Sequence, residues 1–201
     1  MKHAVDPRTG VTAEEAVWHA DKNMEDLVVD IVEKAKPGRW METGTHLAWT
    51  SLWARQRFPS LWIYTVENND EYFRLSGENL SDSQSVLRGH GDSREFLQAF
   101  AKSEPLTLFW LDAHFWEDHP LRGECEIVSK LDRYIVLVDD FHCGDDFPGD
   151  PASPAMVESL GAKYWRPNYS YRHGFSGYAL WTKGIEYTPP MTMRLQAYRV
   201  E

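Results

Sequence analysis

Two adjacent aspartates, Asp139 and Asp140, follow directly on the apolar run of residues 134–138. The run is rich in Val and Ile and does not alternate with polar residues, which is typical of a strand buried on both faces of a parallel sheet. In open α/β sheets ligands bind at the carboxyl ends of the strands, so we expect both carboxylates at the edge of a ligand crevice. Two neighbouring negative charges need a positive partner, and a divalent cation commonly provides it. The alternative is that one aspartate caps the next element while the other is solvated.

Four more predicted strands end in a similar way. The predicted strands cover residues 39–43, 62–67, 85–88, 106–111 and 134–138. Gly44 follows the first strand, Glu67 ends the second, Asp92 follows the third and Asp112 follows the fourth. Right-handed crossovers bring the carboxyl ends of parallel strands to one edge of the sheet. The sequence therefore predicts that these residues meet Asp139 and Asp140 at one edge.

Helical patterns separate these strands. Helices are predicted from Thr12, over residues 24–36, 50–57 and 69–80, through residues 96–100, from Pro120, and over residues 153–161. Two more strands, 178–182 and 192–198, read as a closing antiparallel pair. This pattern predicts an α/β fold with a mostly parallel seven-stranded sheet, helices on both faces and a C-terminal antiparallel hairpin. Residues 1–38 would form a helical lead-in that is loose over residues 1–10, and residues 39–201 a single domain.

Composition excludes some classes of partner. The chain has 201 residues, 42% of them hydrophobic, and a net charge of −10 from 31 acidic and 21 basic residues. Nucleic acid is excluded as the main partner, because phosphate binding needs a basic face. No apolar run approaches the roughly 18 residues of a membrane span, and residues 1–10 lack an apolar signal region. We expect a cytoplasmic protein in which Cys125 and Cys143 are free thiols. The sequence leaves open whether the protein forms a homo-oligomer.

The segment 41–51, Met-Glu-Thr-Gly-Thr-His-Leu-Ala-Trp-Thr-Ser, resembles the first motif of the class I S-adenosylmethionine-dependent methyltransferases, and the resemblance extends from about Arg39 to the end of the chain. In that family an acidic residue precedes a glycine-containing turn beneath the methionine part of the cofactor. His46 and Ala48 stand here where further glycines are usual. The alternative is an ordinary strand–turn–helix with Thr50 as N-cap. The cofactor contacts that the resemblance implies in this segment are Glu42, Gly44, Thr45, Thr50 and Ser51.

The same resemblance implies further cofactor contacts after the next three strands. Glu67 is similar to the residue that accepts hydrogen bonds from both ribose hydroxyls. Asp92 and Ser93 are similar to the adenine contacts, and Asp112 lies beside the cofactor. The alternatives are a surface carboxylate for Glu67 and a plain helix N-cap for Asp92.

Residues 111–114 and 138–141 are similar to the metal-dependent O-methyltransferases related to the macrocin and novobiocin sugar-modifying enzymes. The resemblance implies a magnesium ion held by Asp112, Asp139 and Asp140. His114 stands where those enzymes often carry an acidic general base, and neutral imidazole, with a pKa of about 6.5, could take that role. His142 is the other candidate, either as base or as a ligand that would favour Mn²⁺, Fe²⁺ or Zn²⁺. A packed histidine is the alternative for His114.

The expected function is S-adenosylmethionine-dependent, divalent-metal-assisted O-methylation of a small molecule, such as a sugar-containing or phenolic natural product. Residues 142–151 and the aromatic segment 164–173 would shape the acceptor pocket, although the aromatic residues could equally cover the edge of the sheet. Two alternatives are a metal-dependent hydrolase-like enzyme on the same fold and a non-catalytic binding protein with a decayed site.

Overall fold

The fold was analysed in a computed structural model, which describes residues 1–113, 120–142, 157, 159–160, 162–167 and 176–196. Of the side chains within its strands, those of Asp140, His142, Ser176 and residues 194–196 are not described. Within the described residues, none of the helices combines the length and the apolar character that crossing a membrane requires.

Helices and strands alternate along most of the chain. The helices are α1 (Ala13–Ala16), the short 3₁₀ turn η1 (Val17–Ala20), α2 (Lys22–Ala35), α3 (Trp49–Arg57), α4 (Asp70–Asn79), α5 (Ser93–Phe100) and α6 (Leu121–Ser129). The strands are β1 (Arg39–Thr43), β2 (Trp62–Glu67), β3 (Val86–His90), β4 (Thr107–Leu111), β5 (Tyr134–His142), β6 (Tyr164–Pro167), β7 (Ser176–Lys183) and β8 (Met193–Gln196). The predicted bounds of β1 and β2 are confirmed, whereas β5 continues four residues beyond its predicted end at Val138. The predicted helix over residues 153–161 lies mostly outside the described residues.

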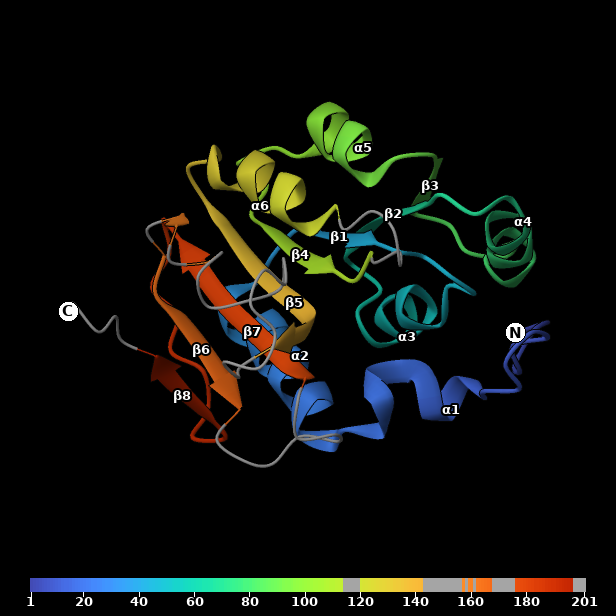
Figure 1. The fold of residues 1–201 in the computed structure, drawn as a ribbon, viewed down its shortest axis with the longest axis horizontal. Coiled ribbons are helices and arrows are strands. Elements are labelled where there is room, and N and C mark those ends of the chain that lie inside the picture. Colours follow the sequence, from blue (N-terminus) through green and yellow to red (C-terminus); the bar gives the residue numbers. More distant parts are fainter. Residues whose placement is uncertain (114–119, 143–156, 158, 161, 168–175, 197–201) are drawn as a thin grey trace.

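The strands form one sheet in the order β3-β2-β1-β4-β5-β7-β6-β8 (Figure 1). β1 to β5 pair in parallel, and β7 is antiparallel to both β5 and β6. The predicted fold class is therefore confirmed, with β1 to β7 as its seven strands. The predicted hairpin between residues 178–182 and 192–198 is wrong, because β7 and β8 are not neighbours in the sheet. β6, which the sequence analysis did not predict as a strand, lies between them and pairs antiparallel with each.

Helices cover both faces of the sheet, with α5 and α6 over one face and α2 and α3 over the other (Figure 1). Side chains alternate between these faces along each strand, as the period of a strand requires. On β4, for example, Phe109 packs toward α5 and α6, whereas Leu108 and Trp110 pack toward α2 and α3. Both faces are apolar, so the central strands are buried on both sides.

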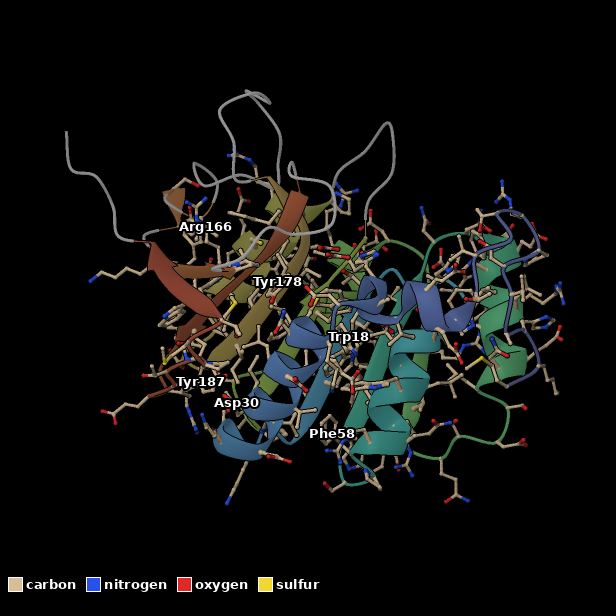
Figure 2. All side chains as sticks on the ribbon, turned by 90° about the horizontal axis from the view of Figure 1, so that it is seen from below. Trp18, Asp30, Phe58, Arg166, Tyr178 and Tyr187 are labelled. Carbon is tan, nitrogen blue, oxygen red and sulfur yellow. The ribbon has the colours of Figure 1, made fainter. Side chains whose placement is uncertain are left out.

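The N-terminal residues pack into the same core. Trp18 is 3% exposed and its ring contacts Trp40 and Trp110 of the central strands (Figure 2). Residues 1–10, which we expected to be loose, are held by hydrogen bonds, since the Trp49 Nε1–H donates to the His3 carbonyl at 2.8 Å and Asp6 is 2% exposed. Their order comes from contacts with distant residues, which local sequence does not reveal.

Candidate active site

The carboxyl ends of β1 to β5 meet along one edge of the sheet, here called the carboxyl edge. The chain order reverses between β1 and β4, which is where ligands bind in open α/β sheets. The predicted site residues that follow these strands therefore stand at the same edge, as the sequence indicated.

The turn between β1 and α3 keeps glycine-like backbone conformations with few glycines. Gly44 has φ +79°, and His46 and Ala48, which replace the usual glycines, also take left-handed conformations with φ of 49° and 62°. A Cβ atom on Gly44 would lie 2.5 Å from the Asp112 carbonyl oxygen. Gly44 is thus required for the close approach of this turn to the end of β4. Ala48, and not Thr50, is the N-cap residue of α3.

Glu67 ties the end of β2 to this turn. One carboxylate oxygen accepts the His46 backbone N–H at 2.7 Å, and the other accepts the Asn69 backbone N–H at 2.8 Å. The side chain is nearly buried, at 7% exposure. The alternative of a plain surface carboxylate is therefore wrong, while hydrogen bonding to a ribose stays a prediction.

Three other predicted cofactor contacts form a buried network below the turn. Glu42 accepts hydrogen bonds from the Ser51 hydroxyl at 2.5 Å and the Thr65 hydroxyl at 2.7 Å, and the Thr45 and Thr65 hydroxyls lie 2.5 Å apart. Burial raises the pKa of Glu42 to about 7. These residues fix the turn from beneath, and Thr50 beside them is half-buried.

The N-terminal segment adds a cluster that the sequence analysis missed. The buried carboxylate of Asp6 lies 3.1 Å from the His46 Nε2 atom and accepts a hydrogen bond from the Tyr72 hydroxyl at 3.4 Å. The ring centroids of His46 and Tyr72 are 4.2 Å apart, and burial lowers the pKa of His46. The sequence Asp-Pro-Arg-Thr-Gly at residues 6–10 is typical of a turn, and it was the available signal for this cluster.

Asp92 caps α5 through the Arg94 backbone N–H at 2.7 Å. Its hydrogen bonds with the Arg94 side chain lower the pKa of this carboxyl. The helix N-cap role is therefore present, and an adenine contact by Asp92 or Ser93 stays a prediction.

Glu124 of α6 is a second buried carboxyl group, which the predicted site did not include. It has no exposed surface, lies 3.4 Å from the Thr43 hydroxyl and hydrogen-bonds the Ser93 side chain. Burial raises its pKa to about 7. An acid among the apolar positions of a predicted helix was the signal for this residue.

Asp112 follows the last residue of β4, and Asp139 lies within β5, directly after the part of β5 that pairs with β4. β4 and β5 pair in parallel up to Leu111 and Val138, so these two aspartates follow the last pair directly. The Asp112 backbone N–H donates to the Thr43 carbonyl at 3.2 Å, which joins the end of β4 to the end of β1.

A β-bulge places the two adjacent aspartates. Val138 pairs with Ala179 and Phe141 with Gly177, so β5 has one more residue than β7 across this interval. Val138 and Phe141 consequently both pack toward α5 and α6, although they are three residues apart. Bulges of this kind interrupt the ladder and redirect side chains, and here Asp139 and Asp140 lie within the interruption.

Asp139 is buried and bonded to the N-terminal segment. Its carboxylate accepts a hydrogen bond from the His19 Nε2–H at 2.6 Å, and its side chain is 1% exposed. Its other oxygen, Oδ1, is buried without a hydrogen-bond partner in the structure as described. His19 is absent from the predicted site, because no local pattern connects it with β5.

Other predicted residues lie outside the described part. His114 is not described, and neither are the side chains of Asp140 and His142. Among the described residues, no group of three or more His, Cys, Asp or Glu side chains could hold a metal ion. The three-aspartate metal site therefore stays a prediction.

The two segments expected to shape a pocket are described only in part. Residues 143–151 and 168–173 lie outside the described residues. Tyr164 of β6 is 2% exposed, with its ring centroid 5.2 Å from that of Phe141. Tyr164 therefore belongs to the core and is not a pocket residue.

Known proteins match this chain through structure only: no protein-family model matches it, and no curated protein matches its sequence. Among solved structures, the O-methyltransferase TomG from Streptomyces achromogenes in complex with SAM aligns with a TM-score of 0.61 at 15% identity, over 84% of this chain and 86% of that chain. The chain has the class I methyltransferase fold. An assigned O-methyltransferase from Klebsiella pneumoniae aligns with a TM-score of 0.63 at 17% identity over 81% of both chains. An assigned caffeoyl-CoA O-methyltransferase from Staphylococcus aureus aligns with a TM-score of 0.58 at 17% identity, over 82% of this chain and 84% of that chain. At these identities the likeness shows the fold alone.

Proposed function

We propose that this chain is an S-adenosylmethionine-dependent O-methyltransferase that acts on a hydroxyl group of a small molecule. The observation that carries the proposal is Glu67, a nearly buried carboxylate at the end of β2 whose two oxygens accept the backbone N–H groups of His46 and Asn69. The methyltransferase fold and its likeness to SAM-bound TomG support the choice of cofactor.

The cofactor would lie over the ends of β1, β2 and β3, here called the donor side. Gly44 lets the backbone approach the methionine part, and the free N–H groups at the start of α3 face the same edge. Glu67 accepts the ribose hydroxyls, and the cap of α5 at Asp92 and Ser93 lies next along the edge to meet the adenine. Every contact on this side comes from an element that the described hydrogen bonds hold in place.

The acceptor would be held over the ends of β4 and β5, here called the acceptor side. Two described carboxylates there would suit a hard divalent cation, which prefers oxygen ligands: Asp139, which keeps one buried oxygen without a described partner, and Asp112, which follows the neighbouring strand β4. A divalent cation, when bound, would lower the pKa of the acceptor hydroxyl. Asp112 and Asp139 would hold it together with Asp140, and His114 or His142 would take the hydroxyl proton. Alignment of the acceptor hydroxyl with the sulfonium methyl group would account for much of the rate enhancement.

Thermal unfolding with and without S-adenosylhomocysteine, and with and without Mg²⁺, tests this function. A ligand at 100 times its dissociation constant adds about 2.7 kcal/mol of stability, which raises the melting temperature by several degrees. We expect a shift with the nucleoside and a further shift when Mg²⁺ is added. An unchanged melting temperature with S-adenosylhomocysteine and with S-adenosylmethionine would overturn the proposed methyltransferase function. A melting temperature that rises with Mg²⁺ alone would favour a metal-dependent hydrolase-like enzyme.

A further inference from the structure

The turn that carries His19 has an unusual backbone. Trp18, His19 and Ala20 have φ values of 54°, 50° and 56°, so three consecutive non-glycine residues are left-handed. Each such residue is strained, because in the left-handed conformation its Cβ atom comes too close to the following carbonyl oxygen. A strained segment of this kind persists only where its surroundings fix it, and such segments concentrate at functional sites.

Both flanks of the turn are anchored. On one side the Trp18 ring contacts Trp40, Trp53 and Trp110 edge-to-face at centroid distances of 5.0 to 6.0 Å (Figure 2). On the other side Asp21 caps α2 by accepting the Asn23 backbone N–H at 2.9 Å. The turn therefore has little freedom, and the direction of the His19 side chain is set by the core.

This fixed direction brings His19 to Asp139, 120 residues away in the sequence. The His19 side chain is 33% exposed, whereas the Asp139 side chain is 1% exposed. Since a carboxylate only accepts hydrogen bonds, the Nε2–H of His19 donates to Oδ2. The contact occupies one oxygen of Asp139 and leaves Oδ1 without a described partner.

We propose that His19 is a positioning residue of the acceptor side, which holds Oδ2 of Asp139 so that Oδ1 is presented to a divalent cation. The inference rests on the proposed function. Carboxylates that bind metals are themselves oriented by hydrogen bonds, and loss of such a partner costs 10- to 100-fold in metal affinity. The strained turn explains how a segment from the opposite end of the chain can orient a β5 side chain that lies in a bulge.

Mn²⁺ binding, followed by the electron paramagnetic resonance signal of the free ion, tests this role in three variants. His19→Ala removes the donor, whereas His19→Gln retains an N–H at a similar reach. His3→Ala is the matched control, because His3 forms a comparable contact with Glu78, at 2.9 Å, near the C-terminal end of α4 and away from β5. We expect Mn²⁺ affinity to fall 10- to 100-fold in His19→Ala, to stay within about threefold in His19→Gln, and to be unchanged in His3→Ala. S-adenosylhomocysteine affinity should stay within about twofold in all three.

Two results would overturn the inference alone, provided that the wild-type chain binds both S-adenosylhomocysteine and Mn²⁺. One is an unchanged Mn²⁺ affinity in His19→Ala. The other is an equal loss in His19→Gln and His19→Ala, which would indicate that the imidazole only fastens the N-terminal segment. A wild-type chain that binds S-adenosylhomocysteine but no Mn²⁺ would overturn both this inference and the metal-assisted part of the proposed function. If it bound neither, the proposed function itself would fail.

Discussion

The donor side and the acceptor side of the carboxyl edge are built in different ways. On the donor side both oxygens of Glu67 accept backbone N–H groups, from residues 21 and 2 positions away in the sequence. On the acceptor side Asp139 has one partner among the described residues, His19, from 120 positions away, and its Oδ1 has no described partner. The donor side is thus completed by neighbouring turns, whereas the acceptor side depends on a distant segment. We therefore expect substitutions on one side to change the affinity for the ligand of that side and to leave the affinity for the other ligand unchanged.

Asp139→Asn should produce the largest difference between the change in Mn²⁺ affinity and the change in S-adenosylhomocysteine affinity. Replacing one carboxylate oxygen by an amide removes a charged ligand, so Mn²⁺ affinity should fall by about 1,000-fold, or about 4 kcal/mol. Calorimetric titration should find S-adenosylhomocysteine affinity within twofold of wild type, because Glu67 and the β1–α3 turn are untouched. A parallel loss of nucleoside affinity would mean that the two sides are not independent.

Gly44→Ala should destabilise the fold where the β1–α3 turn packs against the Asp112 backbone, between the donor side and the acceptor side. The left-handed backbone and the 2.5 Å approach to the Asp112 carbonyl together predict a loss of about 2–5 kcal/mol of unfolding free energy. Gly10→Ala is the control, because Gly10 has φ +75° but nothing within 4 Å of an added Cβ, so only about 1–2 kcal/mol should be lost. Urea unfolding measures both, and equal losses would contradict the close approach.

Glu67→Gln should weaken the donor side selectively. Loss of charge-assisted hydrogen bonds to two hydroxyls is expected to lower S-adenosylhomocysteine affinity by about 100-fold, or about 2.7 kcal/mol. Mn²⁺ affinity should not change. Glu71→Gln, on the exposed surface of α4, is the matched control and should bind like the wild type. Unchanged calorimetric affinity in Glu67→Gln would remove Glu67 from the cofactor site.

The smallest effect should be a pH dependence of the unfolding free energy, which originates in the buried Glu42 carboxyl group beneath the β1–α3 turn. Because burial raises the pKa of Glu42 to about 7, the folded chain holds a proton that the unfolded chain releases near pH 4.5. The Glu42 contribution to stability is therefore complete below that value and declines as the pH rises toward and through 7. Between pH 5.5 and 7.5 the wild type should lose about 2 kcal/mol relative to Glu42→Gln. Urea unfolding of both chains across this range measures the difference, and parallel curves would mean that Glu42 is already ionised.

Sequence patterns were informative where structure is local. The strand run ending in Asp139, the strand ending at Glu67, and the sheet class could be predicted, because buried parallel strands have continuous apolar runs. His46 and Ala48 have left-handed backbone conformations, which the preferences of these residue types do not predict. The roles of Asp6 and His19 depend on contacts 40 and 120 residues away, and the bulge at Asp139 depends on the register with β7. Those features follow from tertiary packing, and the turn sequence at residues 6–10 was the one local signal for the Asp6 cluster.

Hydrogen exchange followed by mass spectrometry, with and without S-adenosylhomocysteine, tests the central claim most directly. The account predicts slowed exchange in the peptides that contain residues 43–50 and 67–70, with little change in the peptides of α2 and β8. Binding that instead protected other segments, or saturating nucleoside that left residues 43–50 and 67–70 unchanged, would contradict a cofactor site at the ends of β1 and β2.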